Sequence, residues 1–121
     1  MKTVLIMDDE PKICDILSRF FAARGLESRS VQTVREALEC LQVFPPDYLI
    51  LDLLMPDGSG LDVLEIAKAR YPKLPIVVLT VVDDPELEAS AAALGASDYI
   101  KKPFDLLNER KWARAFFAFD E

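Results

Sequence analysis

Three short runs of uninterrupted apolar residues constrain the fold of this chain more than any other feature. They are Val4 to Met7, Tyr48 to Leu51 and Ile76 to Leu79. A strand that is apolar at every residue needs cover on both faces, which favours the interior of a parallel sheet between two layers of helices. Two weaker runs, Leu26 to Val31 and Tyr99 to Lys101, suit the edges of the sheet, where a strand must not pair with other chains.

The segments between the runs have helix signals. Pro11 suits a first helical position and Gly25 a left-handed helix end, while Thr33 to Glu36 forms a capping box and Asp84 an N-cap before Pro85. The other signals are a weaker box at Ser59 to Asp62, Gly95 as a helix end, and a final helix after Pro103. The first helix has one expected apolar face, at Ile13, Ile16, Leu17, Phe20 and Phe21.

Strands that alternate with helices through short connections imply right-handed crossovers and a parallel sheet. We expect an α/β fold of the flavodoxin-like type, a three-layer sandwich of a five-stranded parallel sheet, order 2-1-3-4-5, with five helices. The chain has 121 residues, of which 51% are hydrophobic, so residues 1–121 are predicted to form one domain around one core.

Composition narrows the classes of partner and compartment. With 21 acidic and 14 basic residues the formal net charge is −7, which argues against direct nucleic-acid binding and favours protein partners.

The two cysteines bear on the compartment. Cys14 and Cys40 are too few for a disulfide framework and are expected to be small core residues in a reducing compartment. No apolar run approaches the roughly 20 residues of a membrane span, and no secretory signal is evident. We expect a cytoplasmic protein without membrane association.

Polar residues follow the apolar runs where each strand is expected to end. They are Asp8 and Asp9, Asp52, Thr80 and Lys102. Because the carboxyl ends of parallel strands lie along one rim of a sheet, these residues are expected to converge on one crevice. Taken singly, each has an ordinary structural explanation as a helix cap, a turn cap, a strand residue or a surface lysine. Their joint placement at four strand ends favours a functional site.

The chemistry expected at this crevice is phosphoryl transfer. Three carboxylates in one small site repel each other, and a bound divalent cation is the simplest way to keep them ionised. Oxygen ligands in a chain without histidine favour Mg²⁺. Asp52 is the best-placed nucleophile toward phosphorus, Lys102 offers a positive charge and Thr80 a hydroxyl. The Lys102–Pro103 bond is a cis-peptide candidate, although trans is far commoner.

Four segments, VLIMDDEP, YLILDLLMPDGSGLD, PIVVLT and LGASDYIKKPF, closely resemble the response regulator receiver domain family. The resemblance covers residues 2–118. It implies that Asp52 is the phosphoacceptor and that Mg²⁺ is held by Asp8, Asp9, Asp52 and the backbone carbonyl of Leu54. The remaining roles that it implies are a switch pair, Thr80 and Tyr99, and the family lysine, Lys102, before a cis Pro103.

By this resemblance the chain is a signalling switch of a two-component system and not an enzyme beyond its own phosphotransfer and dephosphorylation. The donor to Asp52 would be a histidine kinase or a histidine phosphotransfer protein, since this chain has no histidine. Phosphorylation would draw Thr80 inward, let Tyr99 rotate, and repack the surface of the fourth helix, fifth strand and fifth helix. That surface would control a downstream protein or an output domain.

Several residues depart from the common family pattern. Val81 stands where a small residue is usual, and Leu54 and Val82 are apolar at positions that influence loss of the phosphoryl group, which predicts slow self-dephosphorylation. Trp112 stands where many DNA-binding relatives have an arginine that pairs across a dimer, so a homodimer is left open without that pair. The aromatic residues near the end, Phe116, Phe117 and Phe119, are either partly core residues or a docking surface.

Two other functions stay open on the sequence. One is a pseudo-receiver, an interaction module that is never phosphorylated, for which Val81 is the main support. The other is a phosphatase of the haloacid dehalogenase type, which needs a second aspartate two residues after the nucleophile. Leu54 occupies that position and disfavours it.

Overall fold

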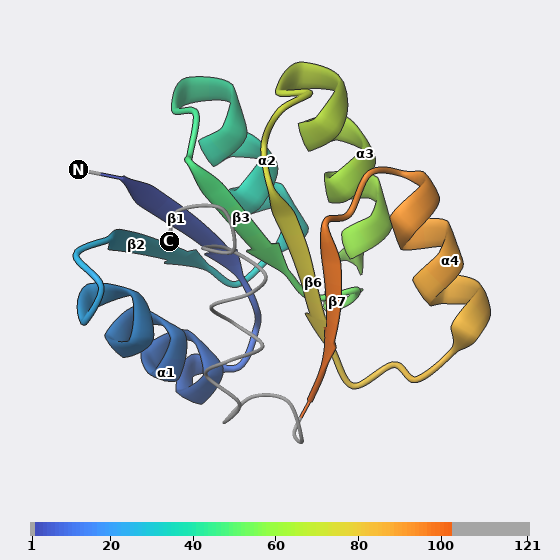
Figure 1. Cartoon of the computed structure of the whole chain (residues 1–121), viewed down its shortest axis with the longest axis horizontal. Coiled ribbons are helices and arrows are strands. Elements are labelled where there is room, and N and C mark those ends of the chain that lie inside the picture. The colour runs from blue at the N-terminus through green and yellow to red at the C-terminus, as the bar shows by residue number, and fades with distance from the viewer. Residues whose placement is uncertain (1, 103–121) are drawn as a thin grey trace.

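The central feature is a parallel sheet with helices on both faces (Figure 1). The computed structural model describes residues 2–102 of the chain. The strands of the sheet are β1 (Thr3–Met7), β2 (Glu27–Val31), β3 (Tyr48–Leu51), β6 (Ile76–Thr80) and β7 (Asp98–Lys101). The described helices are α1 (Pro11–Ala22), α2 (Val34–Val43), α3 (Gly60–Arg70) and α4 (Pro85–Ala93).

The order of the sheet is β2-β1-β3-β6-β7, and every neighbouring pair is parallel. This is the predicted order 2-1-3-4-5, because β4 and β5 belong to a separate hairpin. The flavodoxin-like fold class is confirmed. The two weaker runs form the edge strands β2 and β7, as expected. The fifth helix, expected after Pro103, lies outside the described residues.

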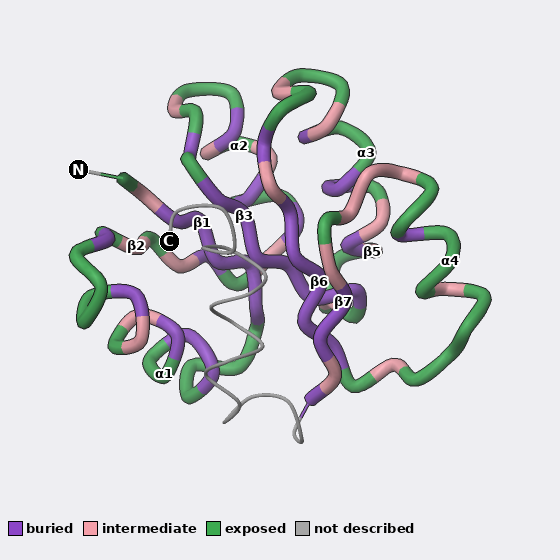
Figure 2. Tube along the Cα trace, viewed as in Figure 1, coloured by how far each residue is buried: buried purple, intermediate pink, exposed green. Residues whose placement is uncertain are grey.

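Two cores cover the two faces of the sheet. Successive side chains of a strand point to opposite faces, so Val4 and Ile6 pack with α1 while Leu5 and Met7 pack with α2 and α3. All residues of β3 and β6 are buried, as Figure 2 shows for the centre of the molecule. The unbroken apolar runs are therefore explained by helices on both faces of the sheet.

Most helix ends follow their sequence signals. Pro11 is the first residue of α1, and Gly25 has a φ of 79°, a left-handed conformation that glycine adopts without a Cβ penalty. The Thr33 hydroxyl accepts a hydrogen bond from the Glu36 amide at the start of α2. No helix among residues 2–102 is both long and apolar enough to cross a membrane.

The expected apolar face of α1 was wrong at one residue, and one expected core cysteine of α2 lies at the margin of the core. Ile16 is 39% exposed, and the buried face of α1 uses Cys14 beside Leu17 and Phe21. Both cysteines are free thiols, but Cys40 is only partly buried. The apolar positions of α1 span a wider arc than the sheet covers, so one residue of that arc is left at the surface.

A small antiparallel hairpin follows β3 and had no counterpart among the expected elements. Its strands are β4 (Leu54–Met55) and β5 (Gly58–Ser59). The hairpin connects the end of β3 to the start of α3. It therefore begins two residues after Asp52.

Candidate functional site

The polar residues at the strand ends are held by an extension of the sheet itself. Asp8, Asp52 and Lys102 each have a backbone N–H that donates to the last residue of a neighbouring strand. The bonds join Asp8 N to Val31 O (3.1 Å), Asp52 N to Met7 O (3.0 Å) and Lys102 N to Thr80 O (2.9 Å). The structure thus brings these residues to one rim, as the order of the strands predicted.

Lys102 lies among three carboxylates at this rim. Its Nζ atom is 2.8 Å from Asp8 Oδ2, 2.9 Å from Asp52 Oδ2 and 2.9 Å from Glu10 Oε1. Lys102, Asp8 and Asp52 are buried, whereas Glu10 is exposed. Sequence reasoning did not single out Glu10. Its position directly after the acidic pair was the one signal, and a surface role explained it equally well.

One ammonium does not balance three carboxylates, and burial and hydrogen bonding shift the pKa values of Asp8 and Lys102. Burial raises the pKa of Asp8 above its ordinary value, although Lys102 and the Glu10 amide, which donates to Asp8 Oδ1 at 2.9 Å, oppose the shift. Burial alone would lower the pKa of Lys102, but the nearby carboxylates outweigh it and raise that pKa. The lysine therefore stays charged, and an excess of negative charge remains in the site.

This acidic cluster suits a divalent cation. Carboxylate oxygens of Asp8, Asp9, Glu10 and Asp52 all lie within 4.8 Å of one another. Asp8 Oδ2 is buried and accepts no hydrogen bond within the described residues, although Lys102 Nζ is close to it. A buried carboxylate oxygen that has an ammonium beside it but no aligned hydrogen bond can also ligate a metal. Since all these donors are oxygens, the residues fit Mg²⁺.

The first residues of the hairpin lie against the Asp52 carboxylate. The Leu54 amide donates to Asp52 Oδ1 at 3.1 Å. The Leu54 side chain is 56% exposed, and Val81 is exposed to the same extent. Leu54 and Val81, two of the residues that depart from the common family pattern, are therefore exposed, and they lie in the segments that follow β3 and β6.

Thr80 and Tyr99 both contact the backbone of Val82. Thr80 is fully buried, and its hydroxyl accepts from the Val82 amide at 3.4 Å. Tyr99 is also buried, and its hydroxyl donates to the Val82 carbonyl at 2.6 Å. Burial raises the pKa of Tyr99, and the charge of Glu88 adds to this effect. The two expected switch residues are thus linked through one residue of the segment that leads to α4.

Other expectations fall outside the described residues. They concern the Lys102–Pro103 bond, Trp112, and the aromatic residues Phe116, Phe117 and Phe119.

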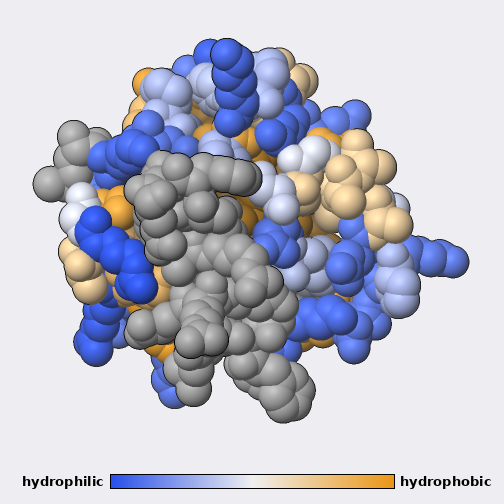
Figure 3. All heavy atoms as spheres, in the orientation of Figure 1, coloured by the Kyte–Doolittle hydropathy of each residue, from blue (hydrophilic) through white to orange (hydrophobic). Residues whose placement is uncertain are grey.

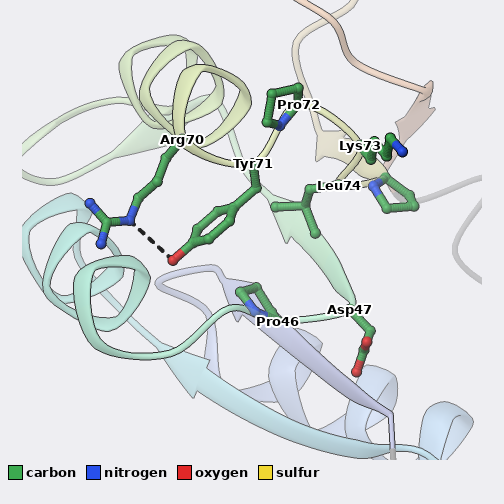
Figure 4. Close-up of a pocket in the computed structure, with 8 residues that line it drawn as sticks. Pro46, Asp47, Arg70, Tyr71, Pro72, Lys73 and Leu74 are labelled. Atoms are coloured by element: carbon green, nitrogen blue, oxygen red, sulfur yellow. Dashed lines mark hydrogen bonds between the residues drawn. The ribbon is translucent and has the colours of Figure 1, made fainter.

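The opposite end of the sheet has a separate hollow of about 470 Å³ (Figure 4). Its lining consists of Pro46, Asp47, Arg70, Tyr71, Pro72, Lys73, Leu74 and Pro75. The Tyr71 hydroxyl donates to Leu41 O at 2.5 Å and accepts from Arg70 Nε at 3.1 Å. The first bond joins the C-terminal ends of α2 and α3. The hollow lies where β3 and β6 begin, so it is separate from the acidic rim at their other ends.

Comparison with known proteins gives one consistent result. A family model described as the response regulator receiver domain matches residues 4–111. The DNA-binding transcriptional regulator NtrC of Proteus hauseri is 36% identical over 103 residues, which are 85% of this chain and 22% of that protein. The response regulator protein PilR of Pseudomonas aeruginosa is 37% identical over 102 residues, or 84% of this chain and 23% of that protein. This chain therefore spans about a fifth of the length of these two curated relatives.

A similar solved structure is that of a response regulator protein from Burkholderia pseudomallei with a phosphorylated aspartic acid, a calcium ion and citrate. The TM-score is 0.86 at 26% sequence identity, over 96% of this chain and 66% of that one.

Proposed function

This chain belongs to the response regulator receiver domain family, and on that premise we propose that residues 1–121 form a single receiver whose Asp52 accepts a phosphoryl group. The observation that supports Asp52 most is its burial at the rim, 2.9 Å from the lysine and within the acidic cluster. The related Burkholderia pseudomallei protein has a phosphorylated aspartic acid and a bound calcium ion, which is consistent with this assignment.

Each residue has a distinct part in the proposed transfer. A carboxylate oxygen of Asp52 attacks the phosphorus of a phosphohistidine on a histidine kinase or phosphotransfer protein, and the histidine nitrogen leaves. Asp8, Asp9, Asp52 and the carbonyl of Leu54 would hold Mg²⁺, which, when bound, offsets the negative charge of the carboxylates and of the phosphoryl oxygens.

Lys102 and Thr80 would then bind the phosphoryl oxygens. The Lys102 ammonium already lies 2.9 Å from Asp52 Oδ2, so a short movement of its side chain reaches an oxygen attached to that carboxylate. The Thr80 hydroxyl accepts a long 3.4 Å hydrogen bond from the Val82 amide, and its own O–H would donate a stronger, charge-assisted hydrogen bond to a phosphoryl oxygen.

The output surface lies over α4 and β7 in this proposal. Movement of Thr80 would change the backbone position of Val82, in the segment that leads to α4. The Tyr99 hydroxyl donates a hydrogen bond to the carbonyl of the same residue. Figure 3 shows weakly apolar residues gathered toward the end of α4 that leads to β7, and α4 exposes Ala89, Ala92 and Ala93. Phosphate would bias two conformations of this surface through its different contacts with each, and a downstream protein or output domain would read the change.

The decisive experiment is intact-mass measurement after incubation with Mg²⁺ and a small-molecule phosphodonor. We expect a phosphate-sized mass gain for the wild type and none for Asp52→Asn. A gain in the variant would reject Asp52 as the acceptor. No gain in either protein would instead favour a receiver-like interaction module that is never phosphorylated.

A further inference from the structure

The tip of the β4–β5 hairpin is tied to the start of α2. Asp57 Oδ1 accepts a hydrogen bond from the Val34 amide at 2.8 Å, and Asp57 Oδ2 accepts one from the Arg35 amide at 3.1 Å. The first amides of a helix have no partner within the helix, and they form its positive end. A carboxylate that accepts two of them forms a charge-assisted link between segments that are 22 and 23 residues apart.

The charge of Asp57 is stabilised by this link. The Val34 and Arg35 amides hold the pKa of Asp57 below its ordinary value. Asp57 is also absent from the acidic group that gathers at the rim among the described residues. Its carboxylate therefore binds the first amides of α2 and does not add to the negative charge of the cation site.

The hairpin needs such a link because it has little stability of its own. Each of its strands has two residues, and isolated two-stranded hairpins are marginal in water even when they are longer. Its first residue, Leu54, has a side chain that is 56% exposed and gives it little anchorage. Yet the Leu54 amide binds the Asp52 carboxylate, and the Leu54 carbonyl is the proposed metal ligand.

The base of the hairpin is held by contacts that do not involve Asp57, so Asp57 acts only at the tip. The Gly60 amide donates to Leu53 O at 3.0 Å, and a Cβ on Gly60 would lie only 2.1 Å from Asp52 O. At the tip, a Cβ on Gly58 would be 3.6 Å from the Val34 side chain, so the hairpin also packs on the start of α2. The segment from Asp52 to Gly60 is thus held both at its base and at its tip.

We infer that Asp57 is a positioning residue for the phosphoacceptor site: by binding the first amides of α2 it fixes the hairpin and so the backbone of Leu54 beside Asp52. The inference rests on the proposed function for its metal and its phosphoryl group. It adds a contribution from α2, whose start is not otherwise part of the site. Outer partners that orient metal ligands commonly change metal affinity by roughly 10–100-fold when they are removed.

The test compares Asp57→Ala with Thr33→Ala in the full chain. Both variants remove hydrogen-bond acceptors from the start of α2, because the Thr33 hydroxyl accepts from the Glu36 amide. Of these two side chains, only that of Asp57 also connects the helix to the hairpin. Mg²⁺ affinity is measured by calorimetry, and phosphorylation by the rate of mass gain with a small-molecule phosphodonor. Amide hydrogen exchange at Val34, Arg35 and Leu54 reports the link directly.

We expect Asp57→Ala to bind Mg²⁺ roughly tenfold more weakly, the lower end of the range for such partners, and to be phosphorylated more slowly. Its Leu54 amide should exchange faster. Thr33→Ala should lose similar thermal stability but keep wild-type Mg²⁺ affinity. Asp57→Asn keeps one acceptor oxygen and should lie between wild type and Asp57→Ala, which preserves the test if Asp57→Ala does not fold.

Equal Mg²⁺ affinity and equal Leu54 exchange in both alanine variants would overturn the inference and reduce Asp57 to a helix cap. A wild-type protein that binds Mg²⁺ but never gains phosphate would reject the proposed function, while the Mg²⁺ comparison would still decide the role of Asp57. A wild type that does not bind Mg²⁺ would overturn both.

Discussion

At the scale of single residues, the site is defined by a buried lysine that neutralises only part of the charge around it. Lys102 contacts two buried carboxylates and one exposed carboxylate. Removing one partner of a buried ion pair leaves an uncompensated charge and is strongly destabilising. A divalent cation bound as proposed would neutralise the same negative charge, so lysine and cation would stabilise the carboxylates in similar ways.

Substitution of Lys102→Met should therefore lower the free energy of unfolding by roughly 3–5 kcal/mol in Mg²⁺-free buffer, and added Mg²⁺ should restore part of this loss. Denaturant unfolding with and without Mg²⁺ measures both effects. The neighbouring Lys101 is the control, because its 2.8 Å pair with Asp83 is partly exposed. Lys101→Met should cost at most about 1 kcal/mol and should show no extra response to Mg²⁺. Equal losses for the two variants would contradict the role of the buried pair.

Two residues beside the site bear on the lifetime of the proposed phosphoryl group. Leu54 and Val82 are apolar and offer no group that could orient an attacking water. Leu54→Asn and Val82→Glu supply such groups, and each should shorten the phosphoryl half-life by about tenfold, equivalent to roughly 1.4 kcal/mol in the barrier. The decay of phosphorylated protein after removal of the donor gives the half-life. Leu54→Met serves as the apolar control, and unchanged half-lives in both polar variants would refute the slow-decay hypothesis.

At the scale of elements, two glycines illustrate different reasons for the absence of a side chain. Gly60 begins α3, where a Cβ would meet the Asp52 backbone oxygen at 2.1 Å. Gly25 has no atom within 4 Å of a Cβ but has a φ of +79°. The first residue needs space, and the second needs a left-handed backbone.

Gly60→Ala should accordingly destabilise the protein by about 1–3 kcal/mol or more, since backbone must shift, and should also weaken phosphorylation of the adjacent Asp52. Gly25→Ala should cost about 1–2 kcal/mol through backbone strain alone and leave the phosphorylation rate unchanged. Thermal melts and the mass assay distinguish the two. A phosphorylation rate in Gly60→Ala equal to that in Gly25→Ala would show that the start of α3 does not constrain the site.

The elements that could be predicted from sequence are those with a strong periodic signal. The uninterrupted runs of β1, β3 and β6 and the mixed runs of β2 and β7 distinguished central strands from edge strands, and the flavodoxin-like arrangement then gave the strand order. The β4–β5 hairpin could not be predicted, because strands of two residues have no period to detect. Glu10 was missed for a different reason: its pairing with Lys102 spans 92 residues and depends on the fold.

At the scale of the whole molecule, a cation bound at the acidic rim would couple binding to folding. The four carboxylates come from two separate segments, residues 8–10 and Asp52, so the unfolded chain has no preformed site. A ligand that binds only the folded state stabilises it by an amount that grows with ligand concentration.

Mg²⁺ should therefore raise the melting temperature, with a gain of about 2.7 kcal/mol in unfolding free energy at a hundred times its dissociation constant. A thermal melt series in MgCl₂ at constant ionic strength checks this. Asp9→Asn should reduce the response, whereas Asp62→Asn, which removes an exposed charge from α3, should not. A melting temperature independent of Mg²⁺ in the wild type would refute a folded-state cation site.

The hydrogen bonds that extend the sheet beyond its strands have a consequence for quality control. Asp8, Asp52 and Lys102 are each bonded through the backbone to a neighbouring strand. A slip of one residue in any of these strands turns every side chain to the opposite face. A misassembled copy would then lose Asp52 or Lys102 from the rim, so under the proposed function an error in strand pairing would produce a protein that cannot be phosphorylated.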